Sequence, residues 1–348
     1  MKIAFIIPSL SNLGPIIVVN NLIEYLAVDK NILIDVYYFD ESEETLDFSV
    51  PVFKIDFLKF TSFDGYDIVH THGIRPDFYS FFNKSCPNTI STQHNIIFEE
   101  YSVSAGVFKA KLVELLWKIS LLNKTRVVAI GETAKKYYKK LLKSSNVVSI
   151  PNGRTFSVSE DISKEDLDKI YSLKSQYKCI GTCTRVLKLK GHKQIIQALV
   201  DLKDFCFILV GDGEYLNDLK ELARHLKVDH RCLFLGYREN ATSYLPLFDI
   251  FSQTSYTESI SIALLEAAAS KKAIVCSDIP VNRDVFSNEE VAFFTLDDIS
   301  SLTDAIKKLS LDSSKYEKNV FEKYQEEYTS EKMAQRYKEL YKELVNEL

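Results

Sequence analysis

The sequence predicts an α/β fold made of two Rossmann-like, doubly wound domains. Short apolar runs alternate with longer stretches of helical periodicity, which is typical of parallel strands joined by helices. This pattern stops in a polar stretch between residues 154 and 177 and then starts again. The length of 348 residues suits two domains, at about 100–200 residues each.

The first series of strands occupies the amino-terminal half of the chain. Each run is apolar over most of its length, as expected of a strand that is buried on both faces. The expected strands are residues 3–7, 31–39, 50–55, 67–72, 88–94, 127–131 and 147–151. Apolar residues spaced three and four apart predict helices over residues 16–26, 108–122 and 133–142.

The second series begins after the turn Pro151-Asn152-Gly153 and an acidic helical stretch at residues 164–173. Its expected strands are residues 178–184, 206–213, 232–237, 250–254 and 273–278. We therefore expect a first domain at residues 1–152 and a second at 153–327. The remaining residues, 328–348, carry one apolar helical face, which predicts an amphipathic packing helix.

Composition excludes several classes of protein. A formal net charge of −5 argues against a general nucleic-acid binder, for which a basic domain is expected. No apolar run approaches the ~20 residues of a membrane-spanning helix, and the start of the chain lacks the long apolar core of a signal peptide. The six cysteines contain no C-x-x-C pair. A reducing cytoplasm is therefore the expected compartment.

The segment TESISIALLEAAAS, residues 257–270, follows an expected strand and opens a helix. A helix that begins after a parallel strand presents free N–H groups to an anion such as a diphosphate. Ser259 or Ser261 can cap this helix. Glu266, on the second turn, could accept hydrogen bonds from ribose hydroxyls, and Glu258 could reach the hydroxyls of a sugar. Taken alone, these glutamates could equally be solvated surface residues.

Three further strand ends carry residues that suit a nucleotide. Arg185 and Lys190 follow the first strand of the second series. Two cations in such a loop suit a pyrophosphate, since arginine offers a fork of donors and lysine a point charge. Gly211 ends the next strand, and Tyr237 follows the third, where its backbone could face a base. Each signal is weak by itself, but their order along the chain strengthens all of them.

These motifs resemble those of the family 4 glycosyltransferases, retaining enzymes with the GT-B fold, in which two Rossmann-like domains face each other across a cleft. The resemblance rests on Arg185, Lys190-Gly191, Gly211-Asp212-Gly213, residues 234–237 and the pair Glu258-x7-Glu266. Residues 66–73, 91–94, 127–153 and 328–344 are also similar to family segments, so the resemblance spans nearly the whole chain.

The resemblance implies a role for each matching residue. Arg185 and Lys190 would hold the donor diphosphate, and Glu266 would bind ribose. Glu258 would contact the transferred sugar. The backbone amides of residues Ser259, Ile260, Ser261 and Ile262 would assist Glu258 in this contact. Gly14 would let the first loop approach the phosphates and the acceptor, His94 would lie close to the transferred sugar, and Tyr237 would lie beside the base. The helix at 328–348 would cross back to the first domain.

The same resemblance implies no cofactor and no metal, with the nucleotide diphosphate sugar as co-substrate. Asp166-Leu167-Asp168 has the spacing of a metal-binding D-x-D motif but lies on the acidic helix, so we do not expect a metal there. The family often has Gly-Phe-Gly after the first glutamate, where this chain has Ser259-Ile260-Ser261. Its first loop also has Leu13 and Pro15 around Gly14. Both departures bear on how sugar and acceptor are held.

Two more histidines precede His94. His70 and His72 flank Thr71 on one expected strand, and we expect one of the two to face away from the site. His72 lies nearer the carboxyl end of the strand, where sites form in α/β sheets. We expect a site role for His94 and, second to it, for His72.

The stretch from residue 108 to 143 contains ten lysines and arginines but only two acids, Glu114 and Glu132. It also places Leu112, Leu115, Leu116, Ile119 and Leu122 on one side of a helix, with Trp117 nearby. Basic helices of this kind can lie on anionic lipid. The alternative is that the apolar side faces the core and the lysines are solvated.

The expected function is retaining transfer of a hexose or N-acetylhexosamine. UDP-sugar is the favoured donor and GDP-sugar the second. The expected acceptor is a glycan or a lipid-linked glycan in bacterial envelope polysaccharide synthesis, such as O-antigen, capsule or lipopolysaccharide. The expected location is the cytoplasm, with contact to the inner face of the plasma membrane as an option. Two alternatives remain: a nucleotide-sugar epimerase, and a non-catalytic GT-B partner of another transferase.

Overall fold

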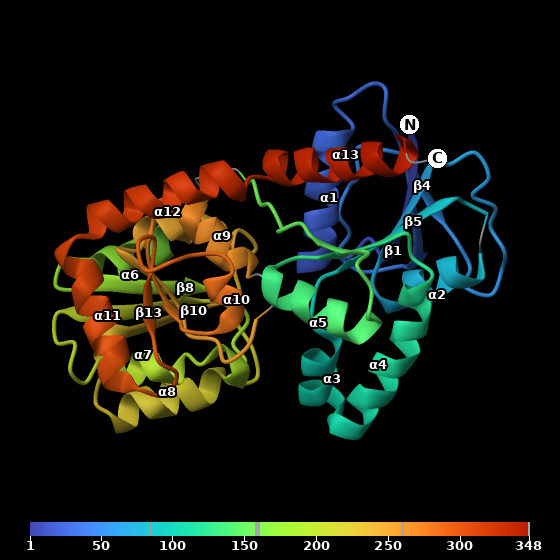
Figure 1. Cartoon of the computed structure of the whole chain (residues 1–348). Coiled ribbons are helices and arrows are strands. Elements are labelled where there is room, and N and C mark those ends of the chain that lie inside the picture. Colours follow the sequence, from blue (N-terminus) through green and yellow to red (C-terminus); the bar gives the residue numbers. More distant parts are fainter. Residues whose placement is uncertain (84, 157–160, 259–260, 347–348) are drawn as a thin grey trace. The chain divides into compact units, whose positions relative to one another are not determined.

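The structure, a computed structural model, describes residues 1–83, 85–156, 161–258 and 261–346, without the side chains of residues 100 and 103–105. The chain forms two compact units. Unit 1 comprises Met1–Arg154 and Glu327–Leu348, and unit 2 comprises Thr155–Glu326. Each unit is an α/β structure built around one parallel sheet, as the sequence predicts (Figure 1).

The sheet of unit 1 has the strand order β3-β2-β1-β4-β5-β6-β7. Its strands are β1 (Lys2–Ser9), β2 (Leu33–Asp40), β3 (Val52–Lys54), β4 (Ile68–His72), β5 (Asn88–Gln93), β6 (Arg126–Ala129) and β7 (Val147–Ser149). Its helices are α1 (Gly14–Leu26), α2 (Ile74–Phe82), α3 (Ile97–Ala105), α4 (Val107–Leu122), α5 (Glu132–Leu142) and α13 (Ser330–Asn346). All neighbouring strands run parallel.

The centre of this sheet is buried on both faces. In β1, residues 3 to 7 are completely shielded from solvent, because the strand lies between β2 and β4. The edge strand β3, in contrast, is exposed at all three positions. Helix α13 packs against α1 over the sheet, and Figure 1 shows the two together.

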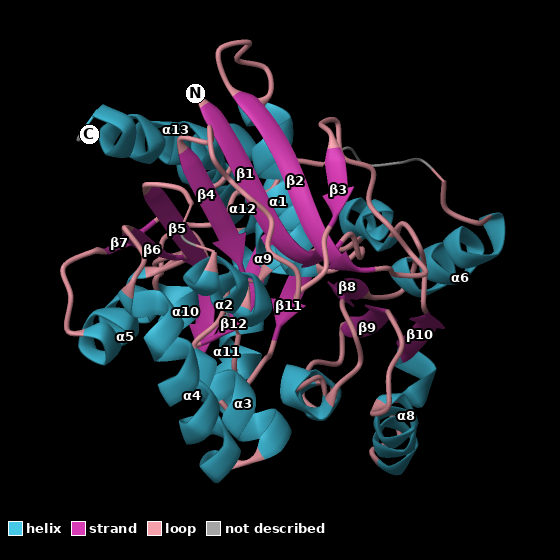
Figure 2. Cartoon of the chain, turned by 90° about the vertical axis from the view of Figure 1, so that its right-hand side faces the viewer, coloured by secondary structure: helices cyan, strands magenta, loops and turns pink. Residues whose placement is uncertain are grey.

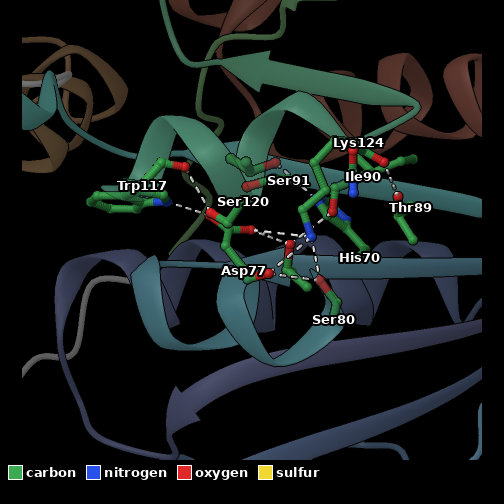
Figure 3. A network of polar contacts seen from close by, with 12 residues as sticks. His70, Asp77, Ser80, Thr89, Ile90, Ser91, Trp117, Ser120 and Lys124 are labelled. Carbon is green, nitrogen blue, oxygen red and sulfur yellow. Dashed lines mark hydrogen bonds and ion pairs between the residues drawn. The ribbon is translucent and has the colours of Figure 1, made fainter. Parts of the chain in front are cut away.

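A buried carboxylate ties α4 to the rest of unit 1 (Figure 3). Asp77, on α2, is fully buried and accepts hydrogen bonds from Trp117 Nε1 at 2.7 Å and Thr71 Oγ1 at 2.5 Å. The ammonium of Lys124, just past the end of α4, lies 3.7 Å from Asp77 Oδ1. Burial lowers the pKa of Lys124, and the nearby carboxylate opposes this shift. Removing either partner would leave the other charge buried and unpaired.

Unit 2 repeats the architecture with the strand order β10-β9-β8-β11-β12-β13. Its strands are β8 (Lys178–Cys183), β9 (Phe205–Val210), β10 (Cys232–Gly236), β11 (Ile250–Gln253), β12 (Ala273–Ser277) and β13 (Ala292–Phe294). Its helices are α6 (Lys164–Lys174), η1 (Lys188–Lys190), α7 (Lys193–Ala198), α8 (Leu216–His225), η2 (Asp229–Arg231), η3 (Ala241–Leu247), α9 (Ile262–Ala269), α10 (Pro280–Arg283), α11 (Ile299–Leu311) and α12 (Ser313–Glu327). Helices lie on both sides of this sheet in Figure 1, and Figure 2 shows the neighbouring strands β2, β1 and β4 of unit 1 side by side.

Among the described residues, no helix combines the length and the hydropathy that crossing a lipid bilayer requires.

Candidate functional site

The sequence-predicted residues of unit 2 gather where the strands of its sheet end. Arg185 and Lys190 follow β8, Gly211 follows β9, Tyr237 follows β10, and Glu258 follows β11. Parallel strands bring their carboxyl ends to one edge of the sheet, and this edge is where α/β proteins bind ligands. The residues that the motif analysis selected separately therefore share one face of unit 2.

An ion pair joins two of these residues directly. Lys190 Nζ lies 2.6 Å from Glu258 Oε1, with side chains 18% and 10% exposed. The hydroxyl of Ser255 donates to the same oxygen at 2.6 Å. Both groups are thus held in the loop region at the strand ends without being sealed from solvent, which suits a site that exchanges ligands.

Backbone contacts fix the loop that carries Lys190. Tyr256 N donates to Leu189 O at 2.9 Å, and Thr254 Oγ1 donates to Lys190 O at 2.9 Å. Gly191 has a φ of +66°, and a Cβ there would lie 2.1 Å from Thr254 O. Only glycine avoids this clash in the left-handed region. These contacts therefore hold the two loops together next to the ion pair.

Close backbone approach also shapes the loop that carries Arg185. Gly211 has a φ of +142°, and a Cβ on it would lie 1.9 Å from Thr184 O. Val186 N donates to Asp212 O at 2.8 Å beside this contact. Arg185 itself is exposed, and within the described part of the chain it forms no ion pair with a carboxylate. Its guanidinium is therefore available to an anion.

Glu266 lies on α9 near the end of β8. Burial, with a smaller contribution from the charge of Glu266, raises the pKa of the Cys183 thiol, so the carboxylate lies near the last residue of that strand. Ser261 precedes α9 at its N-cap position, although its side chain makes no capping bond there, and Ile262 is the first helical residue. Ser259 and Ile260 lie outside the described residues. Tyr237 is 62% exposed.

The other two predicted residues belong to unit 1. Gly14 is the first residue of α1, directly after the loop from β1. His94 follows the last residue of β5 and is partly buried. His94 Nε2 lies 2.9 Å from Nδ1 of His72, at the end of β4. Burial lowers the pKa of His94 to about 4, so this histidine is neutral at neutral pH.

The expectation that His70 and His72 face opposite ways is wrong. Their ring centroids lie 4.2 Å apart, because side chains two positions apart in a strand point to the same face. His70 is nevertheless committed to the fold. Its Nδ1 lies 2.7 Å from the Tyr341 hydroxyl of α13, and its Nε2 lies 2.8 Å from Thr92 Oγ1.

The Asp166-Leu167-Asp168 motif has a structural partner. Asp166 is buried and forms a bidentate ion pair with Arg238 at 2.7 and 3.0 Å. Tyr244 donates to the same carboxylate at 2.6 Å. These bonds hold the pKa of Asp166 below its usual value. Among the described residues, no group of three or more His, Cys, Asp or Glu side chains is arranged to hold a metal ion.

The motif analysis missed Thr254 and Ser255, which hold Lys190 and Glu258 in place. Small hydroxyl residues directly after a buried strand are a signal that could have identified them. The motif analysis also placed His72 second to His94. The bond between these two histidines depends on the register between β4 and β5, in which His72 pairs with Thr92.

Comparison with known proteins bears on this arrangement. Residues 163–327 match the family model described as "Glycosyl transferases group 1". An Escherichia coli protein named O-antigen biosynthesis glycosyltransferase WclY is 27% identical over 315 residues, which is 88% of each chain. A second E. coli relative, 28% identical over 74% of this chain and 70% of its own, is named UDP-Gal:alpha-D-GlcNAc-diphosphoundecaprenol alpha-1,3-galactosyltransferase.

Solved structures agree on the fold. Sucrose-phosphate synthase from Thermosynechococcus elongatus matches with a TM-score of 0.80 at 17% identity over the whole of both chains. Anabaena HepE, solved with UDP and glucose, matches with a TM-score of 0.77 at 17% identity over 98% of this chain and 99% of its own. The two parallel Rossmann-like sheets are those of the GT-B type. With the family model and the named relatives, the chain is a glycosyltransferase.

Proposed function

We propose that this glycosyltransferase is a retaining, family 4 enzyme that moves a hexose or N-acetylhexosamine from a nucleotide diphosphate sugar. UDP-sugar is the favoured donor and GDP-sugar the second. The acceptor is a glycan or a lipid-linked glycan in bacterial envelope polysaccharide synthesis. The relatives support this proposal, since one is named for O-antigen biosynthesis and another for UDP-galactose and a diphosphoundecaprenol-linked acceptor.

The observation that carries the proposal is the cluster formed by Arg185, Lys190, Glu258 and Glu266 at the strand ends of unit 2. The exposed guanidinium of Arg185 and the partly exposed ammonium of Lys190 lie in one loop after β8, which suits a diphosphate. Two carboxylates eight positions apart lie before and inside α9, which suits the hydroxyls of a sugar and a ribose. The backbone of Ile262 and the exposed Tyr237 complete the proposed donor site.

The proposed chemistry uses positive charge in place of a protein nucleophile. As the bond between the sugar and the diphosphate breaks, Lys190 and Arg185 stabilise the charge that develops on the leaving phosphate. The acceptor oxygen attacks from the same face, and the leaving phosphate takes its proton. Glu258 orients the sugar. Lys190 is already paired with Glu258 at 2.6 Å, so donor binding must rearrange or share this bond. No metal or cofactor takes part.

The experiment that tests the donor site is a thermal-shift panel with UDP, GDP, ADP, CMP and dTDP without added metal. A ligand at 100 times its Kd stabilises a protein by about 2.7 kcal/mol, which such an assay detects. We expect UDP to give the largest shift and Glu266→Ala to remove it. Glu221→Ala, at an exposed position of α8, is the matched control and should keep the shift.

The outcomes separate the alternatives. If no nucleotide stabilises the protein, the donor site is wrong, and a non-catalytic partner becomes the better hypothesis. If UDP binds, the purified enzyme is incubated with UDP-sugars and isolated envelope glycans. Retained configuration at the anomeric carbon of the product supports the mechanism, and an inverted product contradicts it. Formation of an epimeric nucleotide sugar without acceptor would identify an epimerase.

We also propose that unit 1 rests on an anionic membrane through α4 and α5. The apolar side of α4 faces away from the core, since Phe108 is 84% and Leu115 58% exposed while Trp117 is buried. The exposed apolar side chains of α4 are Val107, Phe108, Leu112, Leu115, Leu116, Ile119 and Leu122. Lys109 and Lys111 on α4 and Lys136, Lys139 and Lys140 on α5 are exposed as well. Apolar and basic side chains together suit the interface of an anionic bilayer.

Liposome sedimentation tests this surface. Each lysine near an anionic surface contributes about 1 kcal/mol, so reversing Lys136, Lys139 and Lys140 to Glu should weaken binding to anionic vesicles by at least two orders of magnitude. Leu112→Gln with Leu115→Gln should weaken it too. The controls are Lys307→Glu and Leu311→Gln, both exposed on α11. Unchanged binding of both α4 and α5 variants would contradict the membrane proposal and leave the donor site unaffected.

A further inference from the structure

A hollow of about 600 Å³ opens in unit 2 at the edge of the sheet opposite to the strand ends that carry the donor motifs. Tyr177, Asp204, Asp249 and Lys272 line it, and each directly precedes a strand: β8, β9, β11 and β12 in that order. Because these strands are parallel, the four residues share the amino-terminal edge of the sheet. Small-molecule sites measure roughly 300–1,000 Å³, so the hollow has room for a ligand of its own.

Two lysines of the hollow are fixed by bonds within unit 2. Lys272 Nζ donates to the main-chain oxygens of Pro246 and Phe248, both at 3.1 Å. Lys174 Nζ donates to Asp249 Oδ1 at 3.0 Å and to a main-chain oxygen at 2.6 Å. An ammonium group has three N–H donors, and within the described residues two of them have acceptors on each lysine. One N–H donor of each fixed ammonium is therefore left for a ligand.

The hollow also contains acceptors that the fold does not use. The carboxylates of Glu317 and Asp204 and the hydroxyl of Ser313 form no hydrogen bond or ion pair in the part of the chain that the structure describes. Burial lowers the pKa of Lys272, and the charge of Glu317 opposes this shift. An unused carboxylate on α12 thus lies near a fixed ammonium with an unused donor.

The formal charges of the lining cancel, since it contains three lysines and three carboxylates. A site that selects a phosphate needs surplus positive charge, and a site that selects a metal cation needs surplus oxygen ligands of negative charge. Unused N–H donors beside unused carboxylate oxygens instead match a neutral ligand rich in hydroxyl groups, each of which both donates and accepts. The half-buried ring of Tyr177 adds apolar surface for C–H groups.

We propose that this hollow is a second, non-catalytic saccharide site, which binds a neutral sugar residue of the glycan on which the enzyme acts. The choice of a saccharide among hydroxyl-rich and zwitterionic ligands rests on the function proposed above, whereas the balance of charges and donors does not. Since the hollow and the donor motifs lie at opposite edges of one sheet, both sites can be filled at once. The glycan then stays on unit 2 while the donor site exchanges its nucleotide.

Nuclear magnetic resonance tests this site by saturation transfer from the whole protein to the α-methyl glycosides of galactose, glucose, N-acetylgalactosamine and N-acetylglucosamine. We expect at least one glycoside to bind. Glu317→Ala and Asp204→Ala each remove one charged acceptor, and the loss of such a hydrogen bond raises Kd about tenfold or more. Glu326→Ala, at an exposed position of α12 outside the hollow, is the matched control and should leave Kd unchanged.

The outcomes distinguish the hollow from binding elsewhere. A rise in Kd in both hollow variants, with the control unchanged, supports the proposal. Equal Kd values in all variants would place the saccharide at another site and overturn it, as would the failure of every glycoside to bind. Displacement of the glycoside by inorganic phosphate or L-alanine would mean that the hollow selects an ion or a zwitterion, which also overturns the proposal.

Two further measurements keep this test independent of the donor site. Melting curves establish that each variant is folded, and the stabilisation by UDP should persist in Glu317→Ala. A loss of that stabilisation would contradict the separation of the two sites. If no nucleotide binds while Glu317→Ala still weakens glycoside binding, the proposed function fails and the saccharide site stands.

Discussion

The side chain of His192 is buried without a clear hydrogen-bond partner. It is 2% exposed, and neither ring nitrogen forms a hydrogen bond within the described residues, although the Arg185 backbone lies close enough to act on its pKa. Burial, aided by the charge of Lys190, lowers this pKa to about 3. Because the unfolded chain has a histidine pKa of about 6.5, the unfolded state takes up this proton first as the pH falls.

The sign of the pH effect follows from this difference. Between pH 6.5 and pH 3 the unfolded state binds more protons, so the free energy of unfolding falls as the pH falls. At pH 5 the loss due to His192 is about 2 kcal/mol relative to pH 7. We expect His192→Leu to remove this loss. In urea denaturation, the free energy of unfolding of the variant minus that of the unaltered protein should therefore be about 2 kcal/mol higher at pH 5 than at pH 7.

The matched control is His225→Leu, at an exposed position of α8, which should act equally at both pH values. An equal effect of His192→Leu at pH 5 and pH 7 would contradict the argument. The structure buries His192, since its position after Gly191 in a tight turn directs the ring toward Phe207. Such a contact is invisible in the sequence, because it joins two separate elements.

At the scale of elements, the turn η1 and its junction with α7 hold the proposed phosphate-binding loop. We expect Gly191→Ala to weaken UDP binding and lower the melting temperature. An alanine in the left-handed region costs about 1–2 kcal/mol, and its Cβ would also clash with a backbone oxygen of Thr254, which cannot rotate away. Thermal shifts with and without UDP measure both effects.

A control variant separates the cost of the left-handed backbone conformation from the cost of the steric clash. Gly65 has a φ of +83°, and nothing lies within 4 Å of where its Cβ would be. Gly65→Ala should therefore cost only the conformational part and leave the UDP shift intact. If both variants behave alike, the contact between Gly191 and Thr254 does not hold the loop.

Elements were predictable from the sequence where one face or the whole run is apolar. All seven strands of unit 1 were expected, and β1 is buried along the apolar run that predicted it. The three-residue strand β13 was missed, whereas β3 and β7, equally short, were found inside longer apolar runs. The orientation of α4 was also undetermined. The sequence left open whether its apolar stripe faces lipid or the core, and the acceptor at Asp77 draws the opposite side, with Trp117, inward.

At the scale of the whole molecule, the end of the chain returns to its beginning. Helix α13 belongs to unit 1, where Lys338 pairs with Asp29 and Arg126 pairs with Glu343. The apolar face of residues 330–348 predicts a packing helix, but not its partner. That partner depends on polar groups more than 200 positions away, such as His70 and Thr92, which no local pattern can connect to it.

Because α13 packs within unit 1, one of its hydroxyl groups should contribute to the stability of that unit. Tyr341 is fully buried, and its hydroxyl lies 2.7 Å from Nδ1 of His70. Tyr341→Phe should cost about 1–3 kcal/mol, because it leaves a buried ring nitrogen without a partner. For a unit of this size each kcal/mol lowers the melting temperature by about 2–4 °C, so calorimetry should detect the change. Tyr171→Phe, on an exposed tyrosine of α6, should have no such effect.

The variant Tyr341→Phe also tests whether the two units are stable independently of each other. The bond between Tyr341 and His70 lies wholly inside unit 1, so the melting of unit 1 should shift while the stabilisation of unit 2 by UDP stays the same. A loss of the UDP shift in Tyr341→Phe would mean that the donor site depends on α13, and that unit 2 does not hold the nucleotide by its own loops alone. An unchanged melting curve would instead mean that the packing of α13 outweighs its hydrogen bonds.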